Sequence, residues 1–241
     1  MARKKSKVRE FFDSIGVALI AALIIRALII QSYRIPTGSM KDTLMIGDFL
    51  LVNKFIYGIN TPNRIIGTKI RIPSTRLPGF KSPKRDDIVV FRFPNDVTVD
   101  YIKRCVAVAG DTVELRNTRL YINGKPEGKE EFIEQKWDRE ENRNIKYFRI
   151  TKENGQTFII RKAGNPRQQM HDWGPIIVPP DHIFMMGDNR DNSYDSRMWG
   201  ALSLDHVVGE ALVIFFSWDK MEPLWQLNQK IRWGRIFSVI R

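Results

Sequence analysis

The chain has 241 residues, of which 43% are hydrophobic and 27% charged, a globular composition with room for one domain with a sizeable core. Its single cysteine excludes an intramolecular disulfide framework, and no cluster of cysteine and histidine has the spacing of a zinc site. Much of the formal net charge of +12 lies in the end segments 1–10 and 220–241, beside apolar residues. This distribution favours membrane lipid over nucleic acid as a partner, and ordinary solvated charge is the alternative.

The first predicted element is a membrane anchor at residues 11–31, which follows a basic N-terminal segment at 1–10. Residues 15–30 are apolar apart from Arg26, and a helix of that length spans about 24 Å, close to a bilayer core of about 30 Å. The basic segment should stay in the cytoplasm, so the rest of the chain should lie across the membrane. A cleavable signal peptide and a buried soluble helix are the alternatives, but no Ala-x-Ala-like cleavage site follows Ile30.

Beyond the anchor, the sequence is typical of β structure. Asn123-Gly124 is a strong hairpin-turn signal, and the lack of long alternating helices disfavours a βαβ fold. We therefore expect an all-β domain at 32–219, with about 112–180 as an inserted β excursion. Its main strands should lie in segments rich in Val, Ile, Leu and Phe and bounded by turn residues: 48–57, 87–93, 97–109 and 207–216.

The tail at 220–241 is basic and amphipathic. If it is helical, we expect its apolar face to lie on membrane lipid, with docking against the β domain as the alternative. The residues that fall largely on this face are Ile231, Trp233, Ile236, Phe237 and Ile240.

The first stretch that can carry chemistry follows the anchor directly. Ser39 comes after Gly38, which has no side chain to block close approach, and Pro36 stiffens the chain ahead of it. A serine held in such a turn can act as a nucleophile, and an ordinary polar loop is the alternative.

The second stretch is the predicted strand 97–109. Because strand side chains alternate between faces, Lys103 shares a face with apolar neighbours, whereas Arg104 falls on the other face with Asp100. Burial without a counter-charge lowers the pKa of a lysine, and the neutral amine can then take a proton from a serine. The alternative is a lysine whose stem lies along the sheet and whose ammonium reaches water.

The third stretch, 187–197, is dense in Asp, Asn, Ser and Arg. It fails the EF-hand pattern, because the sixth position counted from Asp188 or Asp191 is serine and the twelfth is not glutamate. A solvated turn is the alternative to a self-satisfied network that shapes a site.

A histidine-based triad is the other catalytic alternative. The three histidines are the only candidates, and each has a neighbouring aspartate, but none lies in a glycine-rich or strained turn. They are His171, His182 and His206.

Taken in order, these stretches resemble the type I signal peptidases, also called leader peptidases. The resemblance covers nearly the whole chain after the anchor. It is carried by the basic start, the single early anchor and four segments, namely 33–44, 87–94, 101–111 and 187–200.

The resemblance implies a Ser–Lys dyad serine endopeptidase of the bacterial inner membrane. Ser39 would be the nucleophile, Lys103 the general base, and Thr37 would form the oxyanion hole with the Ser39 backbone amide. Ser193 would orient the lysine. The supporting network would hold Asp195, Arg197, Gly187 and Asn192, and the shallow apolar subsites would be lined by Ile35, Pro36, Met40, Leu44, Tyr101 and Ile102.

The implied substrates are the signal peptides of exported preproteins, bound as an added strand and cut after small residues. The catalytic domain would lie on the periplasmic side and need no metal or organic cofactor. Tyr194 departs from the small residue common at that position. Two alternatives remain, a self-cleaving repressor-type protein and a membrane-anchored binding module without catalysis.

Overall fold

The computed structural model of the protein describes residues 10–19, 30–58, 79–165, 167 and 169–240. Residues 10–19 are helical, and within these described ranges no helix is long and apolar enough to cross a membrane. Residues 20–29 of the predicted anchor lie outside the described part. The first strand already begins at Ile30, so the last two residues of the predicted range 11–31 belong to the β structure.

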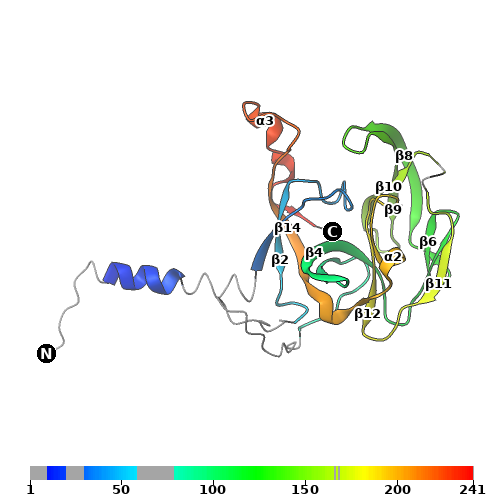
Figure 1. Ribbon diagram of the computed structural model, residues 1–241, viewed down its shortest axis with the longest axis horizontal. Helices are drawn as coiled ribbons and strands as arrows, with labels where there is room; N and C mark the ends of the chain where they lie inside the picture. The colour runs from blue at the N-terminus through cyan, green and yellow to red at the C-terminus, as the bar shows by residue number, and fades with distance from the viewer. Residues whose placement is uncertain (1–9, 20–29, 59–78, 166, 168, 241) are drawn as a thin grey trace.

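An antiparallel sheet of eight strands, counted over the described residues, forms the larger part of the fold (Figure 1). The expectation of a mainly β protein is confirmed, and each of the four predicted strand segments overlaps a strand of this sheet. Seven of them lie in the order β1 (Ile30–Arg34), β2 (Asp48–Asn53), β14 (Val207–Ser217), β3 (Ile88–Phe93), β4 (Asp96–Val108), β12 (His182–Met186) and β13 (Leu202–Ser203). The eighth, β15 (Ser238–Val239), pairs with β14 outside this order.

The chain between β4 and β12 builds two smaller antiparallel sheets, which lie to one side of the larger sheet in Figure 1. One has the order β10 (Thr157–Ala163), β9 (Arg143–Thr151) and β8 (Lys129–Asp138). The other has the order β11 (Trp173–Ile177), β5 (Thr112–Arg116), β6 (Arg119–Ile122) and β7 (Lys125–Pro126). These strands occupy the range predicted for the excursion.

The predicted hairpin turn at Asn123-Gly124 is confirmed. It joins β6 to β7, and both of its residues have positive φ, 53° and 73°. A two-residue turn of this kind needs positive φ at both positions, which Asn and Gly adopt most readily.

The tail is not one amphipathic helix, and the prediction of a helical face over 231–240 is wrong. It consists of α3 (Leu227–Lys230), the 3-10 turn η3 (Trp233–Arg235) and the strand β15 (Ser238–Val239). β15 pairs with Val213 and Ile214, the part of β14 that β3 does not reach. This backbone pairing and the packing of Ile240 on the core override the helical period of the sequence.

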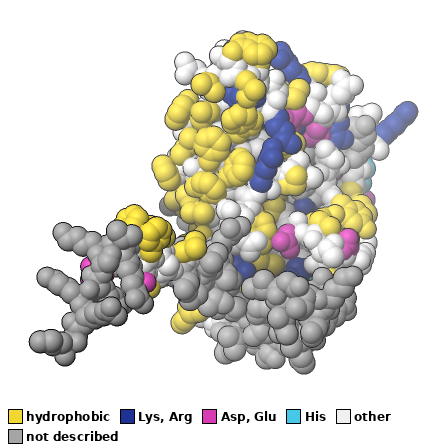
Figure 2. Space-filling view, turned by 60° about the vertical axis from the view of Figure 1, so that its left-hand side comes forward, with side chains coloured by type: hydrophobic (Ala, Val, Ile, Leu, Met, Phe, Trp, Pro, Cys, Tyr) yellow, Lys and Arg dark blue, Asp and Glu magenta, His cyan; other side chains and the backbone are white. Residues whose placement is uncertain are grey.

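Several apolar side chains nevertheless remain exposed, and Figure 2 shows hydrophobic side chains gathered over the upper part of one face of the molecule. Within 220–241 the largest exposed fractions belong to Trp225 (83%), Phe237 (77%), Met221 (66%) and Leu224 (65%). Exposed apolar surface of this kind commonly marks a contact with a membrane or a partner.

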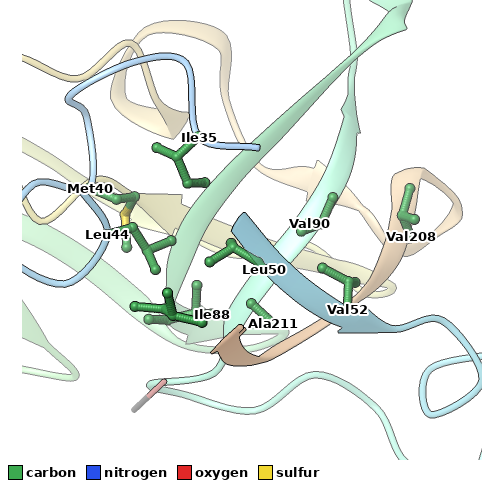
Figure 3. Packing of buried hydrophobic residues seen from close by; sticks show 10 residues of the cluster. Ile35, Met40, Leu44, Leu50, Val52, Ile88, Val90, Val208 and Ala211 are labelled. Carbon is green, nitrogen blue, oxygen red and sulfur yellow. The ribbon is translucent and has the colours of Figure 1, made fainter. Parts of the chain in front are cut away.

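The core of the larger sheet also fixes the loop 35–47 between β1 and β2. Ile35, Met40 and Leu44 from this loop are completely or almost completely buried, at 2%, 0% and 0% exposure. They pack against strand residues such as Leu50 and Ile88 (Figure 3). The loop is therefore anchored by its own apolar side chains near both ends and in the middle.

Two short helical elements lie between β12 and β14 in the chain. They are the helix α2 (Ser196–Trp199) and the 3-10 turn η2 (Leu204–His206).

Candidate active site

Ser39 and Lys103 are in contact although 64 positions separate them in the chain. Ser39 lies in the loop 35–47 between β1 and β2, and Lys103 lies in β4. The Lys103 Nζ atom is 2.7 Å from Ser39 Oγ and donates to the carbonyl oxygen of Ile102 at 3.0 Å. The structure thus brings together the two residues that the sequence suggested as nucleophile and base.

The surroundings of Lys103 disfavour its charged form. The residue is only 4% exposed, so its ammonium has lost most of its contact with water. Burial lowers the pKa of Lys103 to about 8, and the more distant carboxylates of Asp195 and Asp188 partly oppose this shift. Those two carboxylates are instead bonded to arginines, so Lys103 has a pKa suited to proton transfer near neutral pH.

Asp188 links the strand of Lys103 to the loop of Ser39. Its carboxylate forms a fully buried ion pair with Arg104, with N···O distances of 2.9 and 2.8 Å. It also accepts a hydrogen bond of 2.5 Å from Thr43 Oγ1 in the loop. Sequence reasoning missed this role, and the position of Asp188 in the polar stretch 187–197 was the only signal for it.

Asn189 holds the backbone on either side of the serine amide. Its backbone N–H donates to the Ser39 carbonyl at 3.1 Å, and its side-chain Nδ2 donates to the Gly38 carbonyl at 3.0 Å. No described residue accepts a hydrogen bond from the Ser39 N–H itself. This amide can therefore donate to a negatively charged oxygen of a bound group. Asn189 was also missed by the sequence reasoning.

The predicted supporting residues surround the same loop. A Cβ atom at Gly187 would overlap Ser193 Oγ and the Ser39 carbonyl oxygen, so only glycine allows this approach. Asp195 accepts from the Gly187 N–H at 3.1 Å and from two Arg197 nitrogens at 2.8 Å each. A compact, buried hydrogen-bond network therefore holds Gly187 in its position against Ser39.

Ser193 does not make the hydrogen bond to Lys103 that was expected of it. Its Oγ atom is buried and has no hydrogen-bond partner among the described residues. The structure places it beside the site, because it lies against Gly187, but it leaves the hydroxyl unpaired.

The remaining predicted residues lie around the dyad with different exposure. Pro36, Thr37 and Asn192 are exposed, and Tyr101 and Ile102 are partly buried. Ile35, Met40 and Leu44 belong to the core, as described above, so they offer at most a shallow apolar surface to a ligand.

The histidine alternative finds no support in these contacts. His182 Nδ1 lies 2.7 Å from the carbonyl oxygen of Pro180, and His206 Nδ1 lies 3.2 Å from that of Arg92. Over the described residues there is also no group of three or more His, Cys, Asp or Glu side chains arranged to hold a metal ion.

Comparison with known proteins decides the family. Residues 8–218 match the family described as signal peptidase, peptidase S26. The chain belongs to this family. It is therefore a serine endopeptidase of the signal peptidase I group, which agrees with the resemblance seen in the sequence.

Two relatives similar in sequence give the same result. The signal peptidase I of Pseudomonas aeruginosa is 36% identical over 227 residues, which cover 89% of this chain and 75% of that protein. The signal peptidase I of Rickettsia typhi is 33% identical over 257 residues, with 96% and 93% covered. A crystal structure of a signal peptidase I from Enterococcus faecalis is 28% identical, covers 54% of this chain and 97% of that chain, and superimposes with a TM-score of 0.33.

Proposed function

We propose that this signal peptidase is a membrane-bound enzyme that cuts exported preproteins after small residues of the Ala-x-Ala type and so releases their signal peptides. Ser39 is the nucleophile and Lys103 the general base. The observation that carries the proposal is the 2.7 Å contact between Ser39 Oγ and a buried Lys103 whose pKa is lowered to about 8.

The geometry supports an acyl-enzyme mechanism. Neutral Lys103 takes the Ser39 hydroxyl proton while Oγ bonds to the scissile carbonyl carbon, which gives a tetrahedral oxyanion. The Ser39 N–H and the Thr37 hydroxyl donate to this oxyanion. The Lys103 ammonium then gives its proton to the departing amine as the C–N bond breaks. Water, deprotonated by Lys103, hydrolyses the ester and restores Ser39.

The preference for small side chains follows from packing. The apolar side chains of the loop 35–47 are held in the core, so we expect the subsites to be shallow, and a large substrate side chain would have to displace core atoms. The half-buried Tyr101 and Ile102 lie on β4 beside Lys103, where a substrate strand can pair with the protein backbone.

The proposed location is the inner membrane of a bacterium. The anchor precedes β1 and holds the chain with the basic N-terminus in the cytoplasm, and the β domain, from Ile30 to residue 219, works on the periplasmic side. The sequence supports this orientation through its N-terminal positive charge. Ser39 follows the end of β1 by only five positions, which would keep the dyad near the membrane surface.

The test is cleavage of a preprotein by the purified protein in detergent, with the cut site read by mass spectrometry. Ser39→Ala and Lys103→Ala should each reduce processing by about 10³-fold or more, because either change removes the nucleophilic step. Circular dichroism should show both variants folded. Near-normal cleavage by either variant would exclude the dyad, and a wild-type cut after large residues would exclude the proposed specificity.

A further inference from the structure

A second buried lysine lies two positions after the serine. Lys41 is 3% exposed, and its Nζ atom is 3.1 Å from both carboxylate oxygens of Asp138 and 2.6 Å from Glu140. Glu141 is 3.7 Å away. Asp138 is the last residue of β8, and the two glutamates lie in the turn between β8 and β9, so a charged contact joins the excursion to the loop of Ser39.

The stem of Lys41 carries this contact to the residue before the serine. A Cβ atom at Gly38 would lie 3.1 to 3.3 Å from three carbons of the Lys41 side chain. The stem is therefore packed on the Cα atom of Gly38, and the backbone N–H of Lys41 donates to the Gly38 carbonyl at 3.2 Å. Holding the ammonium of Lys41 in place also holds Gly38 in place.

The same turn reaches the loop by a second route. Glu141 accepts a hydrogen bond of 2.7 Å from Asn189 Nδ2, and that atom also donates to the Gly38 carbonyl. Two independent contacts from the β8–β9 turn thus meet at Gly38.

Arg161 in β10 adds a third connection to the loop. Its guanidinium is almost fully buried, pairs with Asp138, and lies 3.6 Å from Asp42. Asp42 has a φ of 74°, a conformation that is uncommon for a residue other than glycine. Side chains of the excursion therefore hold the loop both before Ser39, at Gly38, and after it, at Asp42.

We propose that Lys41 is a positioning residue, which uses Asp138 and the β8–β9 turn to hold Gly38 and Ser39 in the reactive geometry. The inference rests on the proposed role of Ser39. Because the Gly38–Ser39 peptide supplies both the nucleophile and the oxyanion-hole amide, a small displacement of this peptide slows the chemical step. Lys41 itself reaches neither substrate nor proton, since its ammonium is occupied by carboxylates.

The experiment compares Lys41→Met with Lys162→Met in the whole protein in detergent. Lys162 is a matched control, because it is also 3% exposed and pairs with a β8 residue, Glu130, at 2.7 Å, but contacts no residue of the loop 35–47. Active sites are counted by covalent labelling of Ser39 with a serine-reactive acylating inhibitor, and kcat is expressed per labelled site.

We expect Lys41→Met to lower kcat per labelled site by about tenfold or more, since ångström-scale misplacement has effects of this order. KM should change less than about twofold. Lys162→Met should leave kcat per labelled site unchanged. Lys41→Arg, which keeps the charge and can pair with the carboxylates, should recover most of the loss. Asp138→Asn should resemble Lys41→Met, and the double variant should lose little more than either single variant.

Unchanged kcat per labelled site in Lys41→Met would overturn the proposal, and so would an equal loss in Lys162→Met. Failure of the proposed function looks different. In that case the wild-type protein would not cut a preprotein, or Ser39→Ala would cut it as well as wild type does.

Discussion

Burial sets the pH at which Lys103 can act. Its pKa is lowered to about 8 because the ammonium has lost its contact with water, and this outweighs the attraction of Asp195 and Asp188. In the proposed mechanism, only the neutral amine accepts the serine proton. We therefore predict that kcat/KM rises about tenfold per pH unit below pH 8 and levels off above about pH 9.

Steady-state kinetics between pH 5.5 and 10.5 would test this profile. A rate that still climbs tenfold per unit above pH 10 would show an ordinary lysine. A limb centred near 6.5 that disappears in His182→Ala or His206→Ala would assign the base to a histidine instead.

The same shift should cost the protein stability. Lys103 has a folded pKa of about 8 against 10.5 for the free side chain, so the unfolded chain binds more protons between these values. The cost is full below pH 8, falls as pH rises, and is gone above about 10.5. Lys103→Met should therefore raise the free energy of unfolding by about 2–3 kcal/mol at pH 7 and by little at pH 10.5. Urea unfolding at both pH values measures the difference, and an equal gain at both would contradict the titration argument.

At the level of single residues, Ser39 and Lys103 could be predicted from the sequence because their signals are local. A glycine precedes the serine, and alternation along one strand isolates the lysine from its charged neighbour. Lys41 and Asn189 could not be recognised in this way. Their partners lie 97 and 151 positions away, at Asp138 and Gly38, and only the folded chain brings them together.

Among the structural elements, the turn after β12 depends on Gly187. Any side chain there would overlap Ser193 Oγ and the Ser39 carbonyl oxygen. We predict that Gly187→Ala lowers kcat by about tenfold or more, because the added methyl group pushes Ser39 away from Lys103. Gly234→Ala is the control, since nothing lies within 4 Å of a Cβ atom at that position. Equal activity of the two variants would show that the loop tolerates the displacement.

The tail is a second element, and its contribution to the free energy of unfolding can be measured. Asp48 is fully buried and is bonded to Arg235 at 2.6 Å, while Arg232 is 3.9 Å away. Arg235→Met would leave this carboxylate poorly compensated. We predict a loss of about 2 kcal/mol, less than for a fully buried pair because the arginine is partly exposed. Urea unfolding measures the loss, with the exposed Arg119→Met as control.

The four main strand segments were predictable because they combine β-branched and aromatic residues with clear turn boundaries. The tail was not, since its apolar spacing suits a helix as well as the pairing that forms. The deciding partners are Asp48 and the open stretch of β14, which lie far away in the sequence. The strand β8 was also hard to predict, because its sequence KEEFIEQKWD has too many charged residues to show the apolar pattern of a strand.

For the molecule as a whole, the exposed apolar side chains of the tail predict a contact with lipid. In a chain lacking residues 1–29, replacing Trp225 and Trp233 by serine should weaken binding to anionic vesicles by about tenfold, since each exposed ring buries a large apolar area on insertion. Co-sedimentation measures the binding. The control is Trp137→Ser in the excursion. The Trp137 side chain is exposed as well, at 56%, and this change should leave vesicle binding unchanged. Equal loss in both would indicate non-specific adhesion.

The bond between Asp48 and Arg235 also has a meaning for how the protein is made. The two residues lie 187 positions apart, and Arg235 also donates to the carbonyl of Thr43 in the loop that holds Ser39. A ribosome therefore delivers the serine long before it delivers the arginine that completes the loop around it. Until the tail has been made, Ser39 lies in a loop that lacks the contacts of Arg235. Newly made molecules should thus gain proteolytic activity only late in their own synthesis, once the tail has been made and has closed the loop.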